Sequence, residues 1–221
     1  MAHARLTLLP LLGVLVGCGM GPQRPVTAVA PVRPAAAEFP DDPRPLLRYH
    51  SMRLALSLPL PDGQAWRIDD HSRPELVATH APTRSRVLVA VLRADELVGR
   101  KECESIARER KLVPAGELHT LENALDITQQ NYDTRIWVAV EPGSGPGSPI
   151  TGHVMAFGGF LRKCYVFDFS TQIDGAADEP VLSSRLAFAR ARILGGLELD
   201  AFGLIPRQTP EAPAGPAPVL P

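Results

Sequence analysis

This sequence has little net charge, few cysteines and only short apolar runs. Lys and Arg number 23 against 24 Asp and Glu, so the net charge is −1. Such a balance provides no electrostatic attraction to a phosphate backbone, and we expect no nucleic-acid partner. The longest apolar run, residues 6–16, has about 11 residues, whereas a membrane-spanning helix needs roughly 20. We therefore expect no transmembrane helix.

Residues 6–16 have the composition of a secretory leader. The run LTLLPLLGVLV is almost wholly apolar and follows Arg5, which supplies a weak positive charge. A basic start, an apolar run and then small residues is the order found in a signal peptide. Residues 1–17 are therefore predicted to be a signal peptide.

The leader ends in Leu-Val-Gly-Cys, closing at Cys18, which resembles the lipobox of bacterial lipoproteins. The resemblance implies cleavage before Cys18, attachment of a diacylglycerol to its thiol and palmitate among the acyl chains, so that Cys18 anchors the protein to a membrane. The alternative is an ordinary signal peptide with a chance cysteine. Residue 19 is Gly rather than Asp, which by resemblance to the enteric sorting rule favours the outer membrane, facing the periplasm or the cell surface.

Proline divides the rest of the chain. Residues 18–50 are predicted to be the lipidated cysteine and a Pro/Ala-rich tether, because repeated proline excludes helix and central strand. Residues 204–221 have the same composition and are predicted to be a disordered tail. Between them, residues 51–203 suffice for one domain with a core of its own. The prolines of the tether are Pro22, Pro25, Pro31, Pro34, Pro40, Pro43 and Pro45.

The domain alternates between strand and helix patterns. Residues 95–112 and 180–199 show helical spacing, the latter with an apolar stripe and with Arg185 outside it. A shorter helix is predicted at 117–130 from Leu118, Leu121 and Leu125. Runs at 151–157 and 162–170 flank Gly158-Gly159, which predicts a hairpin turning at the glycines. Further strands are predicted at 52–58, 66–68, 75–80, 86–93 and 135–140.

This order predicts an α+β fold, a mostly antiparallel sheet packed by two main helices in a sandwich. The order resembles the PsbP/Mog1-like fold. The resemblance rests on LSLPLPDGQAWRI, SRVLVAVL, ADELVGRKECESIARER, GHVMAFGGFLRKCYVFDFS and SSRLAFARARIL. It implies a fold whose members mostly bind proteins, and it carries no active-site residues.

Two cysteines remain once Cys18 is set aside. An even number in an exported domain indicates a possible disulfide between Cys103 and Cys164. The bridge requires Cα atoms about 4.4–6.8 Å apart. The alternative is two separate buried thiols.

No pattern in the domain indicates catalysis or a cofactor. The run from Asp69 to Ser72 is interpreted as a solvated loop, and the glycine-rich loop at 143–147 lacks the lysine of a phosphate-binding loop. The histidines show no metal-ligand spacing; those considered are His80, His119 and His153. We expect no catalytic residue, metal or cofactor, and interpret Trp66 and Trp137 as core.

Two functional hypotheses follow. The first is a non-catalytic, membrane-anchored envelope lipoprotein that serves as a protein-interaction or accessory subunit of a secretion, motility or envelope-maintenance assembly. The second is a periplasmic small-ligand carrier or enzyme whose site is assembled from distant residues such as His153, Asp168 and Asp69. The second requires a concave pocket.

Overall fold

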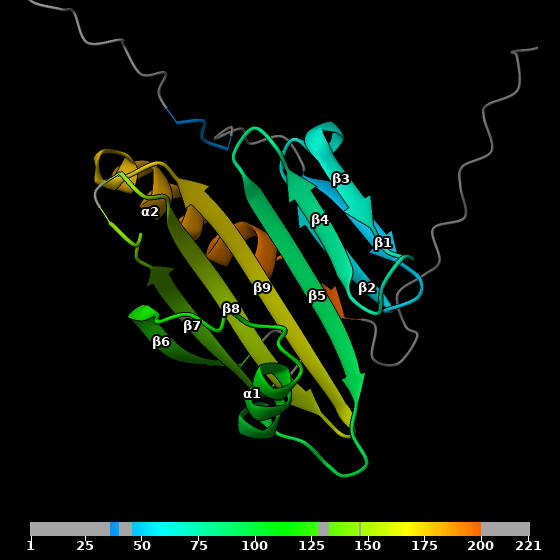
Figure 1. Ribbon diagram of the computed structural model, residues 1–221. Helices are drawn as coiled ribbons and strands as arrows, with labels where there is room; N and C mark the ends of the chain where they lie inside the picture. The colour runs from blue at the N-terminus through cyan, green and yellow to red at the C-terminus, as the bar shows by residue number, and fades with distance from the viewer. Residues whose placement is uncertain (1–35, 40–45, 128–132, 146, 200–221) are drawn as a thin grey trace, which may run out of the picture. The chain divides into compact units, whose positions relative to one another are not determined.

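The computed structural model describes residues 36–39, 46–127, 133–145 and 147–199, all within one compact unit (Figure 1). In these residues two antiparallel sheets pack with two α-helices, which confirms the predicted α+β class. No described helix has both the length and the apolar character needed to span a membrane.

The larger sheet has seven strands, and every neighbouring pair is antiparallel. The predicted strands at 66–68, 75–80, 86–93 and 135–140 all lie in it. Its central strands are long and apolar on both faces, since helices or a second sheet cover each side. In sheet order they are β3 (Trp66–Asp69), β4 (Leu76–His80), β5 (Ser85–Arg93), β9 (Lys163–Ile173), β8 (Ile150–Phe160), β7 (Asp133–Glu141) and β6 (His119–Ile127).

The smaller sheet has the order β1 (Leu47–Ser51), β2 (Leu56–Leu60) and β10 (Glu198–Leu199). The strand predicted at 52–58 is therefore wrong over 52–55, which form a turn with Ala55 at φ 51°. The Ser51 hydroxyl accepts a hydrogen bond from the Leu54 amide at 3.1 Å and stabilises that turn. β1 begins within the range predicted for the tether, as an edge strand after its last proline.

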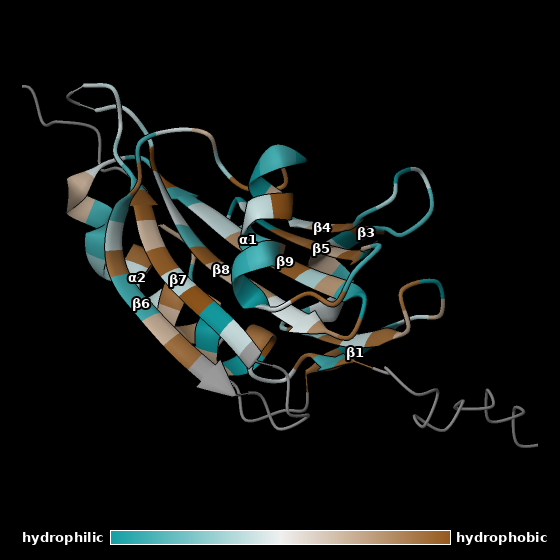
Figure 2. Ribbon diagram, turned by 90° about the horizontal axis from the view of Figure 1, so that it is seen from below, coloured by the Kyte–Doolittle hydropathy of each residue, from teal (hydrophilic) through white to brown (hydrophobic). Residues whose placement is uncertain are grey.

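The two helices cover opposite faces of the larger sheet. α1 (Arg100–Glu109) packs on β7, β8 and β9 above Val166 and Phe157. α2 (Glu179–Phe188) packs on β8 and β9 above Phe167 and continues as a π-helical turn, η3 (Ala189–Leu194). Figure 2 shows apolar bands along the strands and a mainly hydrophilic α1. The predicted helices are both longer than the observed ones.

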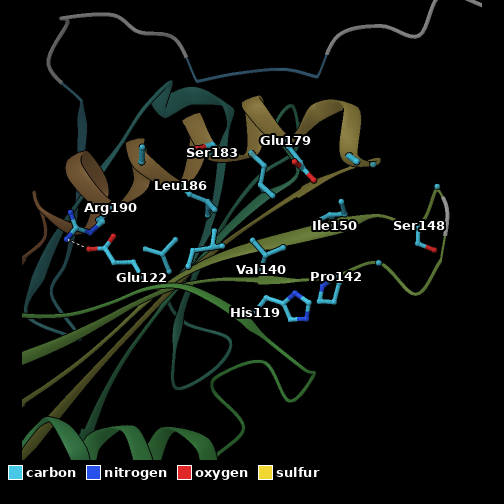
Figure 3. Close-up of a pocket in the computed structure, with 18 of the residues that line it drawn as sticks. His119, Glu122, Val140, Pro142, Ser148, Ile150, Glu179, Ser183, Leu186 and Arg190 are labelled. Carbon is cyan, nitrogen blue, oxygen red and sulfur yellow. Dashed lines mark hydrogen bonds and ion pairs between the residues drawn. The ribbon is translucent and has the colours of Figure 1, made fainter.

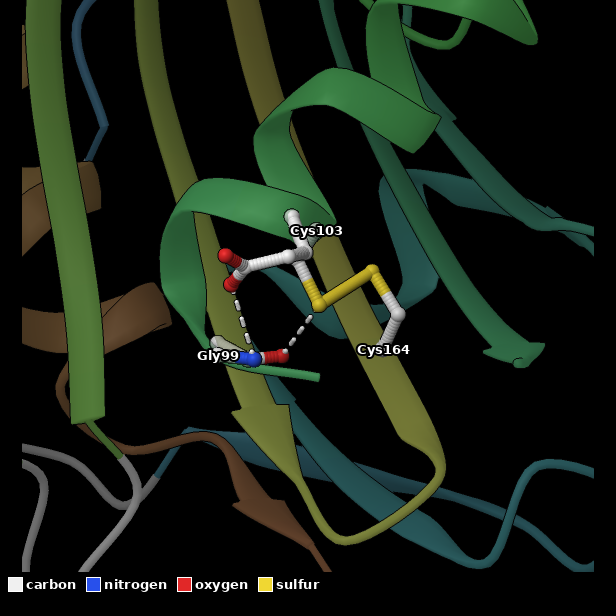
Figure 4. Close-up of a disulfide and its surroundings, with 5 residues drawn as sticks. Gly99, Cys103 and Cys164 are labelled. Atoms are coloured by element: carbon white, nitrogen blue, oxygen red, sulfur yellow. Dashed lines mark hydrogen bonds between the residues drawn. A yellow bond between two sulfur atoms is a disulfide. The ribbon is translucent and has the colours of Figure 1, made fainter. Parts of the chain in front are cut away.

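Cys103 on α1 and Cys164 on β9 form a disulfide with a Cα–Cα distance of 5.3 Å (Figure 4). Both residues are completely buried, so the bridge lies inside the core between α1 and the sheet. The structure thus selects the bonded pair over the alternative of two separate thiols.

The helix predicted at 117–130 is wrong over His119–Ile127, which is strand β6 at the edge of the large sheet, and its last three positions, 128–130, lie outside the described residues. A β-bulge explains the misleading pattern. Thr120 pairs with Ala139 and Glu122 with Val138, so Leu121 is an extra residue between them. The bulge breaks the period of two, and the leucines are then spaced as in a helix.

The hairpin around Gly158-Gly159 is confirmed, but its turn is at Leu161, with φ 54°, and Arg162. The two glycines lie inside β8, where they allow another segment to approach. A Cβ on Gly159 would lie 2.3 Å from the Val98 carbonyl oxygen and 2.7 Å from Gly99. Glycine at position 159 is thus required because the segment that leads into α1 passes so close to β8.

We expect Gly159→Ala to lower the free energy of unfolding by about 2 kcal/mol, as overpacking against backbone typically does. Gly175→Ala is the matched control, because no atom lies within 4 Å of its added Cβ. Urea denaturation of both variants measures the difference. Equal stability of the two variants would show that α1 can shift without cost.

Candidate functional site

A groove of about 990 Å³ runs between α2 and the β6–β8 end of the large sheet (Figure 3). It exists because α2 packs on β8 and β9 and leaves this face of β6 and β7 without a helix. Its floor is apolar and consists of Val138, Val140, Ile150, Leu182 and Leu186. The glycine-rich loop after β7 closes one end.

Small side chains on α2 keep the groove open. Ser183 and Ala187 lie four residues apart on one side of α2, and both line the groove together with Ala191 of η3. Gly152 on β8 allows α2 to lie close to the sheet, because a Cβ there would meet Leu182 at 2.8 Å.

The opposite wall is β6, where Leu121 is 65% exposed. Exposure of so large an apolar side chain beside an apolar groove is typical of a binding surface. The bulge that misled the secondary-structure prediction also turns Leu121 toward the groove.

One ion pair crosses the groove at the end of α2. Arg190 donates to Glu122 Oε1 at 2.7 Å, and both side chains are about two-fifths exposed. An exposed pair of this kind adds at most about 1 kcal/mol to stability. The pair supplies polar groups of both signs at one end of the groove, whose remaining polar lining includes His119, Glu179 and Ser183.

The structure brings together two of the three residues proposed for a catalytic or carrier site. His153 Nδ1 lies 3.2 Å from Asp168 Oδ1, and both side chains are 6% exposed. Asp69 lies on β3, four strands from β8, or roughly 19 Å at the usual strand spacing. The predicted three-residue site is therefore not assembled.

The His153–Asp168 pair also lacks a reacting partner among the described residues. His153 Nε2 is buried without a hydrogen bond, and the nearby carboxylate of Glu141 is 3.9 Å away. No hydroxyl in the described part of the chain bonds to it, and no group of three or more His, Cys, Asp or Glu in that part is placed to hold a metal ion. The pair is part of the sheet's interior.

The loop from Asp69 to Ser72 is only partly the solvated loop predicted from the sequence. Asp69 accepts hydrogen bonds from the Ser72 hydroxyl and from backbone amides, which lower the pKa of Asp69 to about 2. Asp70 is 4% exposed and accepts from Arg53 at 2.9 Å and from the Tyr49 hydroxyl at 3.2 Å. Asp70 thus links the two sheets as a structural residue.

Residues 36–39, which we call the strap, dock onto the domain although they lie within the predicted tether. Phe39 is 7% exposed. Its ring packs with four aromatic rings at centroid distances of 5.3–6.2 Å, those of Trp66, His80, Phe169 and Phe188. These rings come from β3, β4, β9 and α2 and together form the Phe39 cleft.

Arg185 holds the strap by its backbone. Predicted to lie outside the apolar stripe, Arg185 is instead 2% exposed. Its guanidinium donates to the Ala37 carbonyl at 2.9 Å through Nε, and also through Nη2. Nη1 donates to the Thr83 carbonyl at 2.9 Å and to the Gln172 carbonyl at 3.1 Å. Burial, and then the charge of Arg84, lower the pKa of Arg185.

The energetics of strap docking are nearly balanced. Burying one Phe side chain contributes about 2–3 kcal/mol, and a hydrogen bond from a charged donor contributes about 1.5–3 kcal/mol. Ordering the backbone of four residues opposes docking by about 4–8 kcal/mol. The remainder is within a few kcal/mol of zero, so the strap is held weakly by comparison with the core strands.

His80 connects the Phe39 cleft to the Arg185 contacts. Its Nδ1 bonds to Thr83 Oγ1 at 2.7 Å, and hydroxyl contacts of 2.8 Å continue through Ser85 to Thr171, which also accepts from Arg185. Desolvation lowers the pKa of His80, and Asp62, 3.5 Å from Nε2, partly offsets this. His80 is consequently a buried, neutral imidazole.

This burial predicts a pH dependence. The unfolded chain takes up the His80 proton near the ordinary value of 6.5, whereas the folded chain takes it up only at lower pH. The free energy of unfolding should therefore be constant above pH 6.5 and fall as the pH decreases below it, until the folded pKa is passed. Urea denaturation between pH 7.5 and 5 should show the decrease, and His80→Gln should reduce it. If the free energy of unfolding falls as steeply with pH in His80→Gln as in the wild type, then other groups cause the decrease.

No protein-family model matches the chain, and no curated protein matches it. Among solved structures, the Ran-binding protein Mog1p of Saccharomyces cerevisiae is similar with a TM-score of 0.49 and 11% identity, over 70% of this chain and 95% of that one. A protein from Bacteroides thetaiotaomicron is similar with a TM-score of 0.41 and 11% identity, over 71% of this chain and 49% of that one. At this identity neither likeness bears on what the chain binds.

Proposed function

We propose that the protein is a non-catalytic lipoprotein of the bacterial cell envelope, anchored at Cys18, that acts as a protein-interaction or accessory subunit of a larger envelope assembly. The observation that supports this most is the apolar groove between α2 and β6. It is a preformed surface with an apolar floor and an exposed Leu121 on its rim, and its polar lining includes His119, Glu122, Glu179 and Arg190 (Figure 3).

The groove suits a protein segment with apolar side chains. Its floor offers Val138, Val140 and Ile150, and its rim offers Leu121, which are contacts that apolar side chains fill with shape complementarity. The Glu122–Arg190 pair gives a partner one polar point by which to set its orientation. The proposed assemblies are those of secretion, motility or envelope maintenance.

A small-ligand carrier is the second candidate, and the size of the groove favours it. Small-molecule sites usually measure about 300–1,000 Å³ and are mostly apolar. The groove, at about 990 Å³, lies at the upper end of that range. A carrier would retain an apolar molecule through purification, whereas a docking subunit would retain a protein.

The docking function is tested with two matched leucines. Leu121 and Leu125 lie on β6 and are each 65% exposed, but Leu121 lines the groove and Leu125 pairs with Arg135 beside the α1 face. A photo-crosslinking residue at Ser183, in the groove, should capture one discrete envelope protein in intact cells. Leu121→Arg should reduce that capture at least tenfold, and Leu125→Arg should not.

Ser184 is the control position for the crosslinker, because it is exposed on α2 but does not line the groove. Equal capture from Ser183 and Ser184, or equal loss with both leucine variants, would remove the groove from the proposal. Extraction of a small apolar molecule from the wild type, with no protein crosslinked, would favour the carrier.

The anchor is tested separately. Cys18→Ala should move the protein from the membrane fraction to the soluble fraction while the disulfide and thermal stability of the domain stay unchanged. Continued membrane fractionation of Cys18→Ala would overturn the lipoprotein assignment and leave the groove proposal in place.

A further inference from the structure

We propose that the Phe39 cleft is a peptide-binding site, and that the strap is its reversible occupant within the same chain. The ligand class is a short extended peptide with an aromatic side chain two residues after a carbonyl that accepts from Arg185. The proposal does not depend on the groove or on the lipid anchor.

The cleft is built by elements that are held together without the strap. Trp66 Nε1 donates to the Pro61 carbonyl at 2.6 Å, which fixes one wall. Hydroxyl contacts from Thr83 through Ser85 to Thr171 fix the opposite wall across β5 and β9. Because the walls do not depend on the strap, the cleft persists when the strap leaves.

The strap docks through one side chain and one main-chain carbonyl, which are the kinds of group by which proteins recognise peptides. Phe39 is the buried side chain, whereas Ala37 and Glu38 are exposed. The polar contact is to a main-chain carbonyl, which any peptide carries. The aromatic side chain therefore provides selectivity, and the guanidinium provides a sequence-independent hold.

Arg185 gives the cleft its preference for a main-chain ligand. Within the described residues its guanidinium donates to carbonyl and hydroxyl oxygens, those of Ala37, Thr83, Thr171 and Gln172. Of these, the Ala37 carbonyl belongs to the strap and the other three belong to the domain. An incoming peptide carbonyl replaces Ala37 without any rearrangement of the remaining three.

Occupation by the strap competes with occupation by a free peptide. A segment tethered a few residues away acts at a millimolar effective concentration, so a free peptide enters the intact protein poorly. Removing the Phe39 side chain abolishes that competition and exposes the cleft.

The test uses the full chain with Trp137→Phe, so that Trp66 is the remaining tryptophan. Phe39→Ala should shift Trp66 emission to longer wavelength. An acetylated, amidated peptide with the sequence of residues 35–41, AAAEFPD, should reverse the shift with a millimolar dissociation constant. The same peptide with Ala in place of Phe should have no effect. The parent chain should need about twice as much peptide as Phe39→Ala, because the strap competes at a millimolar effective concentration similar to the dissociation constant.

Phe39→Leu keeps an apolar side chain in the cleft and guards against simple unfolding, which circular dichroism monitors in each variant. If Phe39→Ala unfolds, the peptide is titrated into Phe39→Leu instead. Binding to Phe39→Leu should be weak, because leucine still partly occupies the cleft. An unshifted Trp66 emission in folded Phe39→Ala, or equal responses to the Phe and Ala peptides, would overturn the proposal.

Discussion

Replacing both Cys103 and Cys164 by Ser is expected to lower the free energy of unfolding by about 4 kcal/mol, the largest effect we predict. The bridge closes a loop with a sequence separation of 61, and the chain-entropy model assigns about 4 kcal/mol to a loop of that length. For a domain of this size the melting temperature should fall by roughly 10 °C. Urea denaturation and thermal melts of the oxidised wild type and the double variant measure the difference.

Reductant provides the control. Dithiothreitol should destabilise the wild type by a similar amount and leave the double variant unchanged. A wild type that is indifferent to reductant, with two reactive thiols after denaturation, would show that the cysteines are not bonded in solution.

The second large effect is expected at Arg185. Arg185→Met keeps the apolar length of the side chain but leaves the carbonyls of Thr83 and Gln172 without this donor. A buried polar group that loses its partner typically destabilises by about 1–3 kcal/mol, and relief from burying a cation offsets part of the total. We expect a net loss of about 3 kcal/mol, measured by urea denaturation.

Arg185→Lys separates charge from geometry. Lysine preserves the positive charge but cannot reach acceptors on both sides as a planar guanidinium does, so it should recover little of the lost stability. Arg192→Met is the surface control, since Arg192 is exposed and should change stability by less than about 0.5 kcal/mol. An Arg185→Met variant as stable as the wild type would mean that desolvation cancels the hydrogen bonds.

The sequence predicted those parts of the fold whose signal is local. β5 and β7 are short runs rich in β-branched and other apolar residues, and such composition and length favour strands. The leucines of β6 have helical spacing because a bulge at Leu121 shifts them, so this segment predicts a helix. Gly158-Gly159 predicts the hairpin turn because glycine favours turns, whereas Gly159 is needed for the close approach of Val98.

The candidate sites were less accessible to prediction, because they depend on what tertiary packing leaves uncovered. The groove arises where α2 covers two strands and not their neighbours, and no residue pattern records that choice. Arg185 lies between Leu182 and Leu186 on the buried side, but an arginine suggests a surface position until its carbonyl acceptors are seen. The possible Cys103–Cys164 bridge followed from cysteine number and could be foreseen.

The order of strands in the large sheet also bears on how the protein reaches this structure. β8 and β9 pair through a tight turn, and β7 joins them across a short loop, so this part can form from neighbouring segments. The β5–β9 pairing instead joins Ser85 with Thr171, from opposite halves of the domain. Closing so long a loop is slow, and it requires β9 to have been synthesised. β3, β4 and β5 pair between successive segments, but the other edge of β5 stays unpaired until β9 is present, and such an exposed apolar edge favours aggregation of the nascent protein.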